Sequence, residues 1–317
     1  MAQLSVGNLQ FCKLSFMETG SLTKPFSVDE IKSAMWDYDS FKSLGPDDIN
    51  FRFIKNFWHE MKDDIVRFVT KFHRNGKLSK SINSTFIALI PIVDSPQYLN
   101  DFRPILLVGS LYKILAKILA NWLRQVIGSV VSEVQSAFVK NRQILDGILI
   151  ANEVVDEASK SKKDFLMFKV DFEKAYDFVD WGYLNEVTGS MDFPTLWRKW
   201  IKEVSIERGL RQGDPLSPFL FLLAAEGLNV LMKALVEAKM FTGYRVGGAT
   251  PVVVSHLQFV DDTLLIRNKS WANVRAMRAG LVLFEAMSGL KVNFHKSSLV
   301  GVNINASWLS KTASVLG

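Results

Sequence analysis

Residues 165–171 read FLMFKVD, and residues 256–266 read HLQFVDDTLLI. In both stretches an apolar run of the kind found in buried strands meets an aspartate. The second stretch has two apolar runs on either side of a short polar turn, which predicts a β-hairpin with Asp261 and Asp262 between its strands. Together the two stretches predict a small, mainly antiparallel sheet in the second half of the chain.

Helical patterns surround this sheet. Ser27 and Glu30 form a capping box that predicts the start of one helix. Apolar periodicity predicts the other helices at 51–73, 110–127, 144–160, 194–203, 215–237 and about 270–287. One short strand is expected at 85–93, and a last strand after residues 288–294. This order predicts an α+β fold, with the small sheet packed on helices.

Composition narrows the class of protein. Of the 317 residues, 48% are hydrophobic and 22% are charged, which excludes a disordered or collagen-like chain. The single cysteine, Cys12, excludes a disulfide framework and a Cys-rich zinc site. The N-terminus has no signal-peptide pattern, and the longest apolar run, Phe219–Ala225, is far shorter than the about 20 residues of a membrane span. We expect a soluble intracellular protein of the nucleus or cytoplasm, with no membrane partner.

The three aspartates are candidate metal ligands. Each stretch alone has an ordinary explanation, since Asp171 could begin a helix and the Asp pair could be a plain turn. Tight hairpins prefer Asn-Gly or Asp-Gly, however, and nothing in the turn neutralises two adjacent carboxylates. A divalent cation such as Mg²⁺ or Mn²⁺ would neutralise them, and phosphoryl transfer with two metals needs such a cluster. The net charge of +6 is compatible with an anionic partner such as nucleic acid.

Further motifs follow one another along the chain in a specific order. They are GPDDINF (45–51), ALIPIVDSPQYLNDFRPILL (88–107), YKILAKILANWL (112–123), VQSAFVKNRQILDGI (134–148), FKVDFEKAYDFVDW (168–181), GLRQGDPLSPFLF (209–221), FVDD (259–262) and SGLKVNFHKS (288–297). In this combination the chain resembles the reverse transcriptases of LINE-type (non-LTR) retrotransposons, with plant copies the most similar, from about Phe26 to Val302.

The resemblance implies a right-hand polymerase fold. Residues 26–164 would form the fingers and residues 165–305 the palm, with 1–25 as a leader and 306–317 as a truncated tail. The implied activity is RNA-directed DNA polymerisation, with an RNA template, a DNA primer and deoxynucleoside triphosphates as partners. Asp171, Asp261 and Asp262 match the carboxylates that bind Mg²⁺ or Mn²⁺ in this family.

The resemblance also implies roles for single residues around the nucleotide. Tyr176 matches the aromatic residue beneath the incoming sugar, and Arg103 matches a residue that grips the triphosphate. Gln212 and Gly213 match a turn that lies against the template base and nucleotide, and Lys296 matches a lysine that protonates the leaving pyrophosphate. The ordinary alternatives are a core tyrosine, surface arginine and lysine side chains, and a plain loop before a helix.

Basic residues are candidates for contacts with template or primer phosphates. Such contacts would be salt-dependent and independent of base sequence. The alternative is a solvated basic surface. The candidates are Lys113, Lys117, Arg124, Lys140 and Arg142.

Four substitutions depart from the family pattern. Ile92 stands where the family has a lysine that faces the triphosphate, and Leu106 replaces a serine. Asp48 replaces a glycine at a turn, and Val260 replaces the alanine before the Asp pair. We expect weaker nucleotide binding than in the family, chiefly because of Ile92.

The connection IKEVSIER (201–208) is also short, since the family has a hairpin of about two dozen residues there. We therefore expect a fragment with poor polymerase activity. The alternatives are a catalytically inactive nucleic-acid-binding remnant and a protein that now serves only interactions.

Overall fold

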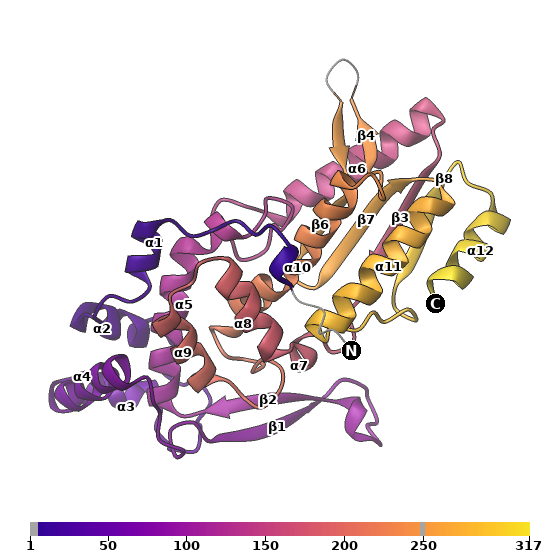
Figure 1. Ribbon diagram of the computed structural model, residues 1–317. Helices are drawn as coiled ribbons and strands as arrows, with labels where there is room; N and C mark the ends of the chain where they lie inside the picture. Colours follow the sequence, from indigo (N-terminus) through magenta and orange to yellow (C-terminus); the bar gives the residue numbers. More distant parts are fainter. Residues whose placement is uncertain (1–5, 248–250) are drawn as a thin grey trace. The chain divides into compact units, whose positions relative to one another are not determined.

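A computed structural model describes residues 6–247 and 251–317 of the chain (Figure 1). Its contacts divide the described chain into two compact units. The sheet unit takes its residues from 1–13, 127–191 and 221–317, and the helical unit consists of 14–126 and 192–220. These limits differ from the expected boundary at 164/165, because residues 127–164 fold with the sheet and residues 192–220 with the helical unit.

The sheet unit is built on a four-stranded antiparallel sheet with the strand order β6-β7-β3-β8. The nearly continuous apolar run of β3 places apolar residues on both faces of this sheet, as expected for its central position next to β7 and β8. This arrangement confirms the predicted α+β fold with a mainly antiparallel sheet. The four strands are β3 (Phe165–Val170), β6 (His256–Phe259), β7 (Asp262–Asn268) and β8 (Ser298–Val302).

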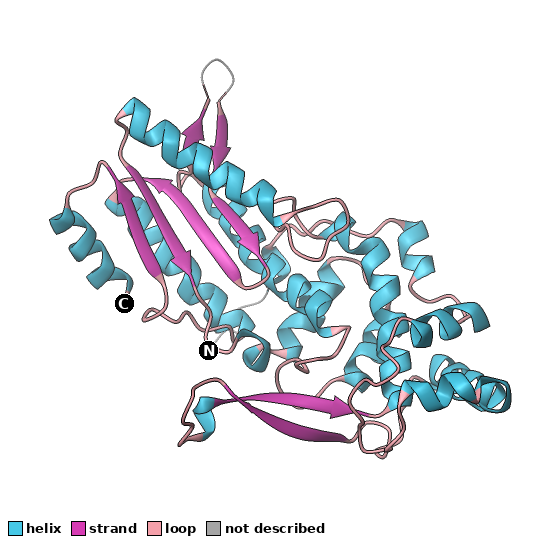
Figure 2. Cartoon of the chain, turned by 180° about the vertical axis from the view of Figure 1, so that it is seen from behind, coloured by secondary structure: helices cyan, strands magenta, loops and turns pink. Residues whose placement is uncertain are grey.

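Helices cover both faces of this sheet (Figures 1 and 2). On one face, α6 (Ile144–Ser161) places Val154 and Ala158, one helical turn apart, against Phe165 and Ile266. On the other face lie α11 (Trp271–Ser288) and the part of α10 (Ser217–Glu237) that belongs to this unit. Burial of apolar side chains on both faces is the main contribution to the stability of the sheet.

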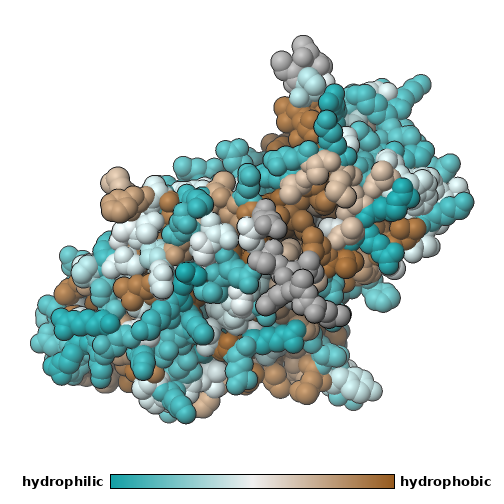
Figure 3. All heavy atoms as spheres, viewed as in Figure 1, coloured by the Kyte–Doolittle hydropathy of each residue, from teal (hydrophilic) through white to brown (hydrophobic). Residues whose placement is uncertain are grey.

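Shorter elements complete the sheet unit. The expected strand–turn–strand at 252–267 is interrupted at Ser255, so that its first part pairs with another strand as a separate hairpin. This hairpin exposes Val252 and Val253, and Figure 3 shows the hydrophobic surface there. The expected tail at 306–317 is largely helical. The elements are the 3₁₀ helix η1 (Val6–Asn8), α7 (Ala175–Phe178), α8 (Trp181–Ser190), β4 (Tyr244–Val246), β5 (Val252–Val254) and α12 (Ala306–Leu316).

The helical unit contains most of the remaining helices and one two-stranded hairpin, in which β1 pairs antiparallel with β2. The single helix expected at 51–73 is divided into α3 and α4, because Phe57 between them leaves the helical conformation. The elements are α1 (Phe16–Ser21), α2 (Val28–Trp36), α3 (Phe51–Asn56), α4 (Trp58–Asn75), β1 (Thr85–Pro91), the 3₁₀ helix η2 (Leu99–Asp101), β2 (Phe102–Val108), α9 (Thr195–Val204) and α5 (Ser110–Val130), the last up to residue 126.

The short connection after Trp200 closes within the helical unit without unwinding the helix. Helix α9 continues to Val204, and only Ser205–Arg208 remain before Gly209, whose φ is +71°. The hydroxyl of Tyr112 contacts the end of α9 and the motif after the connection, since its one hydrogen is shared between the carboxylate of Asp214 (2.6 Å) and, at a longer distance, the carbonyl of Val204 (3.2 Å). The end of α9 and the following motif are therefore held by one buried side chain.

Helix α10 is long and apolar enough to cross a membrane by length and composition alone. Most of its apolar window is buried inside the protein, as in the core helix of a globular fold. Its apolar character therefore reflects packing rather than a membrane span.

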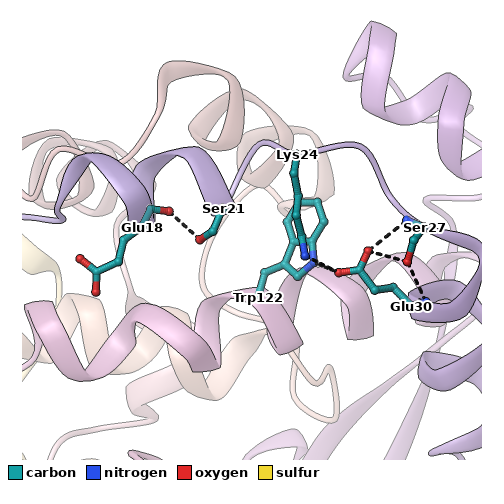
Figure 4. A network of polar contacts seen from close by, with 6 residues as sticks. All are labelled: Glu18, Ser21, Lys24, Ser27, Glu30 and Trp122. Atoms are coloured by element: carbon teal, nitrogen blue, oxygen red, sulfur yellow. Dashed lines mark hydrogen bonds and ion pairs between the residues drawn. The ribbon is translucent and has the colours of Figure 1, made fainter.

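A polar network holds the start of α2 in the helical unit (Figure 4). Ser27 and Glu30 form the predicted capping box, and Glu30 also accepts hydrogen bonds from Trp122 Nε1 (2.8 Å) and forms an ion pair with Lys24 (2.8 Å). Burial alone would raise the pKa of Glu30. The hydrogen bonds from Lys24, Ser27 and Trp122 together outweigh this effect, so the net pKa is lowered from its ordinary value of 4.5 to about 2. The ionised carboxylate thus joins α2 to α5.

Replacement of Glu30 by glutamine should destabilise the chain at neutral pH. Because the pKa of Glu30 is lower in the folded than in the unfolded chain, its contribution is complete above its ordinary value of 4.5 and is lost as pH falls toward 2. We expect Glu30→Gln to lower the free energy of unfolding by about 1–2 kcal/mol at pH 7 and by much less at pH 3. Urea unfolding at both pH values measures this difference, and Asp29→Asn in the same helical turn is the control, with little effect.

An uncompensated charge lies inside the sheet unit. Arg267 on β7 is 0% exposed, and none of its three guanidinium nitrogens has a hydrogen-bond partner among the residues that the structure describes. Burial lowers the pKa of Arg267 to about 9. An unpaired buried guanidinium is among the costlier features that a core can contain.

Replacement of Arg267 by methionine should therefore stabilise the chain, because methionine has a similar length and no charge to desolvate. We expect the free energy of unfolding to rise by about 1–3 kcal/mol. Thermal and urea unfolding measure the change. Arg275→Met, at an exposed position of α11, should have little effect. A loss of stability in Arg267→Met would contradict the assignment.

Candidate active site

Asp171 is the residue directly after β3, as the sequence predicted. Its backbone is held on both sides by the NFHKS motif, 122 or more residues later in the chain. The Asp171 N–H donates to Ser297 Oγ (3.1 Å), and its carbonyl accepts from the N–H of Asn293 (2.8 Å). Two motifs that are far apart in sequence therefore form one rigid structure around this aspartate.

The second pair of aspartates lies where β6 turns into β7. Phe259 pairs with Asp262, so the two-residue turn consists of Val260 and Asp261. The predicted Asp-Asp turn is therefore shifted by one residue, and Asp262 begins the strand β7. Val260 carries the positive φ (+54°) that a tight hairpin requires.

The pairing of β3 with β7 brings the aspartates to the same end of the sheet. Val170 pairs with Thr263, so Asp171 and Asp262 occupy the next positions on neighbouring strands. Desolvation has the largest effect on the pKa of Asp261 and raises it. A hydrogen bond from its own backbone N–H lowers the pKa, and repulsion from Asp262 and Asp171 raises it. The positive charge of Lys169 has the smallest effect and lowers it. The net pKa of Asp261 is raised, as expected for a carboxylate among other carboxylates.

Lys169 is a member of this cluster that the sequence analysis missed. Its ammonium forms an ion pair with Asp262 (Nζ–Oδ1 3.0 Å), so one carboxylate of the pair is neutralised by the protein itself. The hydrogen bond and charge of Asp262 raise the pKa of Lys169. Its place in the sequence carried a signal, because residues two apart on a strand point to the same face and Lys169 lies two before Asp171.

The donor atoms of this cluster fit a hard divalent cation. Carboxylate oxygens are the ligands that Mg²⁺ prefers, and it commonly takes only one or two of them from a protein. Asp171 and Asp261 supply two carboxylates that repel each other. In the described parts of the chain, however, no group of three or more His, Cys, Asp or Glu side chains is arranged to hold a metal ion.

Tyr176 lies close enough to these carboxylates to be affected by their charge. It belongs to the short helix α7, and its ring stacks on Phe221 (centroids 5.0 Å apart, planes at 11°). Burial, with a smaller effect of the Asp261 charge, raises the pKa of Tyr176 to about 12. The phenol is therefore un-ionised at neutral pH and has a fixed ring orientation.

Lys296 lies in the turn that holds Asp171, and its side chain is exposed. Its backbone N–H donates to Asn293, both to the carbonyl (3.2 Å) and to Oδ1 (3.2 Å). The turn thus fixes the backbone of Lys296, while its ammonium group extends to solvent.

The remaining predicted nucleotide residues belong to the helical unit. Arg103 is exposed on β2, opposite Ile90 of β1. The carbonyl of Gln212 accepts a hydrogen bond from the N–H of Leu106 (3.3 Å), which fastens the turn to β2. Gly213 has a φ of +93°, a conformation that favours glycine.

Two buried side chains anchor this turn, and the sequence analysis did not find them. Asp214 is 6% exposed and accepts from Tyr112 and from the N–H of Leu216 (2.8 Å). Arg211 is 4% exposed, donates to Asn83 Oδ1 (2.7 Å) and lies over the Tyr112 ring. In the motif RQGD (211–214), Arg211 and Asp214 are therefore buried anchors, and Gln212 and Gly213 form the turn between them.

The five basic candidates have different environments. Lys113 is only 7% exposed and donates to the carbonyl of Ser43 (2.7 Å), so its expected contact with phosphate is not supported. Lys117 forms an ion pair with Asp37 (3.3 Å). Lys140 and Arg124 are exposed.

Arg142 has a structural role. Its guanidinium donates to the carbonyls of residues 128, 131, 132 and 135, the last two at 2.5 and 2.9 Å. It thereby caps the end of α5 and fixes the segment that follows. These bonds occupy the donors that a contact with phosphate would need.

Comparison with known proteins gives the family. The reverse transcriptase (RNA-dependent DNA polymerase) family matches residues 93–315. The uncharacterized 149 kDa protein of transposon TX1 from Xenopus laevis is 27% identical over 295 residues, which is 87% of this chain and 22% of that protein. The Pol polyprotein from the type-1 retrotransposable element R2 of Popillia japonica is 26% identical over 238 residues, 69% of this chain and 32% of that protein.

A shorter similarity involves a plant protein. The uncharacterized mitochondrial protein AtMg01250 of Arabidopsis thaliana is 48% identical over 60 residues, 19% of this chain and 48% of that protein. The chain thus spans less than a third of the length of the first two relatives and about half of the third. The family match covers well over half of the chain and includes every aspartate of the cluster. The chain therefore belongs to the reverse transcriptase family and is a reverse transcriptase domain of a LINE-type (non-LTR) retrotransposon.

Proposed function

We propose that this domain is an RNA-directed DNA polymerase, which adds deoxynucleotides to a primer 3′-end on an RNA template. The observation that carries the proposal is the arrangement of Asp171 beside the Val260–Asp261 turn at one end of the sheet. Membership of the family alone shows common descent and not activity. The presence of both carboxylates at one end of the sheet supports the proposal that the domain catalyses the reaction.

Asp171 and Asp261 would hold Mg²⁺ or Mn²⁺ through their carboxylate oxygens. When bound there, the cation would neutralise phosphate charge and activate the attacking primer oxygen. Asp262 would be the third carboxylate once Lys169 releases it, because the ion pair now occupies its Oδ1. Lys169 would balance the negative charge of the cluster while no cation is bound.

The residues around the nucleotide would position it. The ring of Tyr176, fixed by Phe221, would lie beneath the deoxyribose and exclude a ribose 2′-hydroxyl. Arg103 would bind the triphosphate through its planar guanidinium. Gln212 and Gly213 would support the template base, and the exposed ammonium of Lys296 would protonate the pyrophosphate as it leaves.

Contacts with the template and primer would rest on fewer residues than the sequence suggested. Lys140 and Arg124 have exposed side chains and are suited to phosphate oxygens. Binding through them would weaken as salt rises. A domain of this activity would act inside the cell, in the nucleus or cytoplasm.

A second function has its own observation in its favour. Ile92 is 56% exposed at the place where the family carries a lysine for the triphosphate. The loss of that charge weakens nucleotide binding and leaves nucleic-acid binding untouched. The alternative is therefore a catalytically inactive nucleic-acid-binding remnant.

Primer extension with an Asp261→Asn control separates the two functions. On poly(A) primed with oligo(dT), with Mn²⁺ or Mg²⁺, we expect slow extension by the wild type and none by Asp261→Asn, since one carboxylate ligand is lost. Asp261→Asn should also weaken Mn²⁺ binding, measured by electron paramagnetic resonance, by about tenfold or more. It should raise the melting temperature of the metal-free chain, because the raised pKa of Asp261 reflects desolvation of the carboxylate and, to a smaller extent, repulsion from Asp262 and Asp171, and the neutral amide relieves both.

Asp63→Asn, at an exposed position of α4, is the matched control and should leave all three measurements unchanged. Equal Mn²⁺ affinity in wild type and Asp261→Asn would remove this aspartate from the site. Salt-sensitive RNA binding without any extension would favour the remnant.

The sugar selectivity should depend on Tyr176. In Tyr176→Ala the ring that stacks on Phe221 is absent, so a 2′-hydroxyl meets no obstruction. We expect the ratio of deoxynucleotide to ribonucleotide incorporation to fall by about tenfold or more in single-turnover extension, which corresponds to about 1.4 kcal/mol. Tyr183→Phe, which removes only a hydroxyl that donates to the carbonyl of Ala224 (2.9 Å), should keep the ratio. An unchanged ratio in Tyr176→Ala would show that another residue excludes the ribose.

A further inference from the structure

The turn that carries Asp261 contains a strained residue. Val260 has a φ of +54°, in the left-handed region that β-branched residues rarely adopt. Such a conformation persists only where surrounding groups hold it, and it is typical of functional sites. Since Asp261 follows directly, the backbone of Val260 determines the direction in which the Asp261 carboxylate leaves the turn.

One side chain holds both polar backbone groups of Val260. The N–H of Val260 donates to Gln135 Oε1 (3.0 Å), and Gln135 Nε2 donates to the carbonyl of Val260 (3.3 Å). Gln135 is 1% exposed, and its Oε1 also accepts from the N–H of Ala137 (3.0 Å). The amide of Gln135 therefore pairs with the backbone of Val260 as a partner strand would.

The backbone that carries Gln135 is itself fixed. It lies parallel to β6, where the N–H of Gln258 donates to the carbonyl of Val134 (2.8 Å) and the N–H of Ser136 donates to the carbonyl of Gln258 (3.1 Å). Arg142 donates to the carbonyl of Gln135 (2.9 Å). The N–H of Ser132 donates to the buried Glu226 (3.0 Å). The amide is thus presented from a rigid segment rather than from a mobile loop.

We propose that Gln135 is a positioning residue for the metal-binding carboxylates, which holds Val260 in its left-handed conformation and thereby directs Asp261 toward Asp171. The inference rests on the proposed polymerase function for its purpose, but the bonds that carry it are independent of that function. Gln135 would act through the backbone of Val260 and not on the reacting atoms themselves.

Gln135→Met tests this proposal, because methionine has a similar length and can form neither bond. Two measurements are made on the full chain, namely hydrogen exchange of the Val260 N–H by NMR and Mn²⁺ affinity by electron paramagnetic resonance. We expect exchange to become faster and Mn²⁺ affinity to fall by about tenfold, the effect typical of groups that orient metal ligands. Gln125→Met, at an exposed position of α5, is the matched control.

The double variant Gln135→Met/Val260→Gly separates positioning from simple stabilisation. Glycine adopts positive φ without strain, so the turn no longer needs to be held. We expect Mn²⁺ affinity to return to within about threefold of the wild type, while exchange at position 260 stays fast because the acceptor is still missing. A variant that lost affinity through general destabilisation would not recover in this way.

The outcomes distinguish this proposal from the proposed function. Unchanged Mn²⁺ affinity in a folded Gln135→Met overturns the positioning role and leaves the polymerase function standing. If the wild type binds no Mn²⁺, the proposed metal site is wrong. Faster exchange in Gln135→Met, together with a melting temperature that Val260→Gly restores, would still show that Gln135 holds Val260 in its left-handed conformation. If Gln135→Met does not fold, a folded double variant supports the proposal and an unfolded one overturns it.

Discussion

The antiparallel pairing of β3 with β7 is the constraint on which the candidate site depends. Because Val170 pairs with Thr263, Asp171 directly after β3 aligns with Asp262, the first residue of β7, and two aspartates 91 positions apart in sequence meet at one end of the sheet. A shift of this register by one residue would turn every side chain of β7 to the opposite face. The apolar residues on both faces, between α6 on one side and α11 on the other, make such a shift costly, so the core of the sheet unit also fixes the chemistry.

Much of this arrangement could be predicted from the sequence. The hairpin at Asp261 followed from two apolar runs around a polar turn, the α+β class followed from the order of the expected helices and strands, and the family followed from the order of motifs. The spacing of two residues places Lys169 on the same face as Asp171, but its ion pair with Asp262 and the bonds of Gln135 to Val260 could not be predicted, since they join residues 93 and 125 positions apart. Only the strand register places these atoms together, and no local pattern contains that register.

Two of the substitutions that depart from the family pattern lie at positions with an unusual backbone conformation. Asp48 and Val260 both have positive φ (+51° and +54°), so each places a side chain where the backbone favours a residue without one. At Val260 the protein compensates through the amide of Gln135. The unpaired guanidinium of Arg267 has no such compensation among the described residues. The chain therefore combines a well-supported turn with a core that contains a costly charge, and stability and chemistry depend on different residues.

The division of the chain into units has a consequence for its synthesis. Residues 192–220 of the helical unit are translated after α6 and β3 of the sheet unit, and β8 completes the sheet only at Val302. Neither unit is a continuous piece of sequence, so neither can finish folding while the first half of the chain emerges from the ribosome. Pairings over such sequence distances close large loops and form slowly. A cut near residue 164 would divide the sheet unit itself, so the two parts of the chain on either side of this position do not correspond to separate compact units.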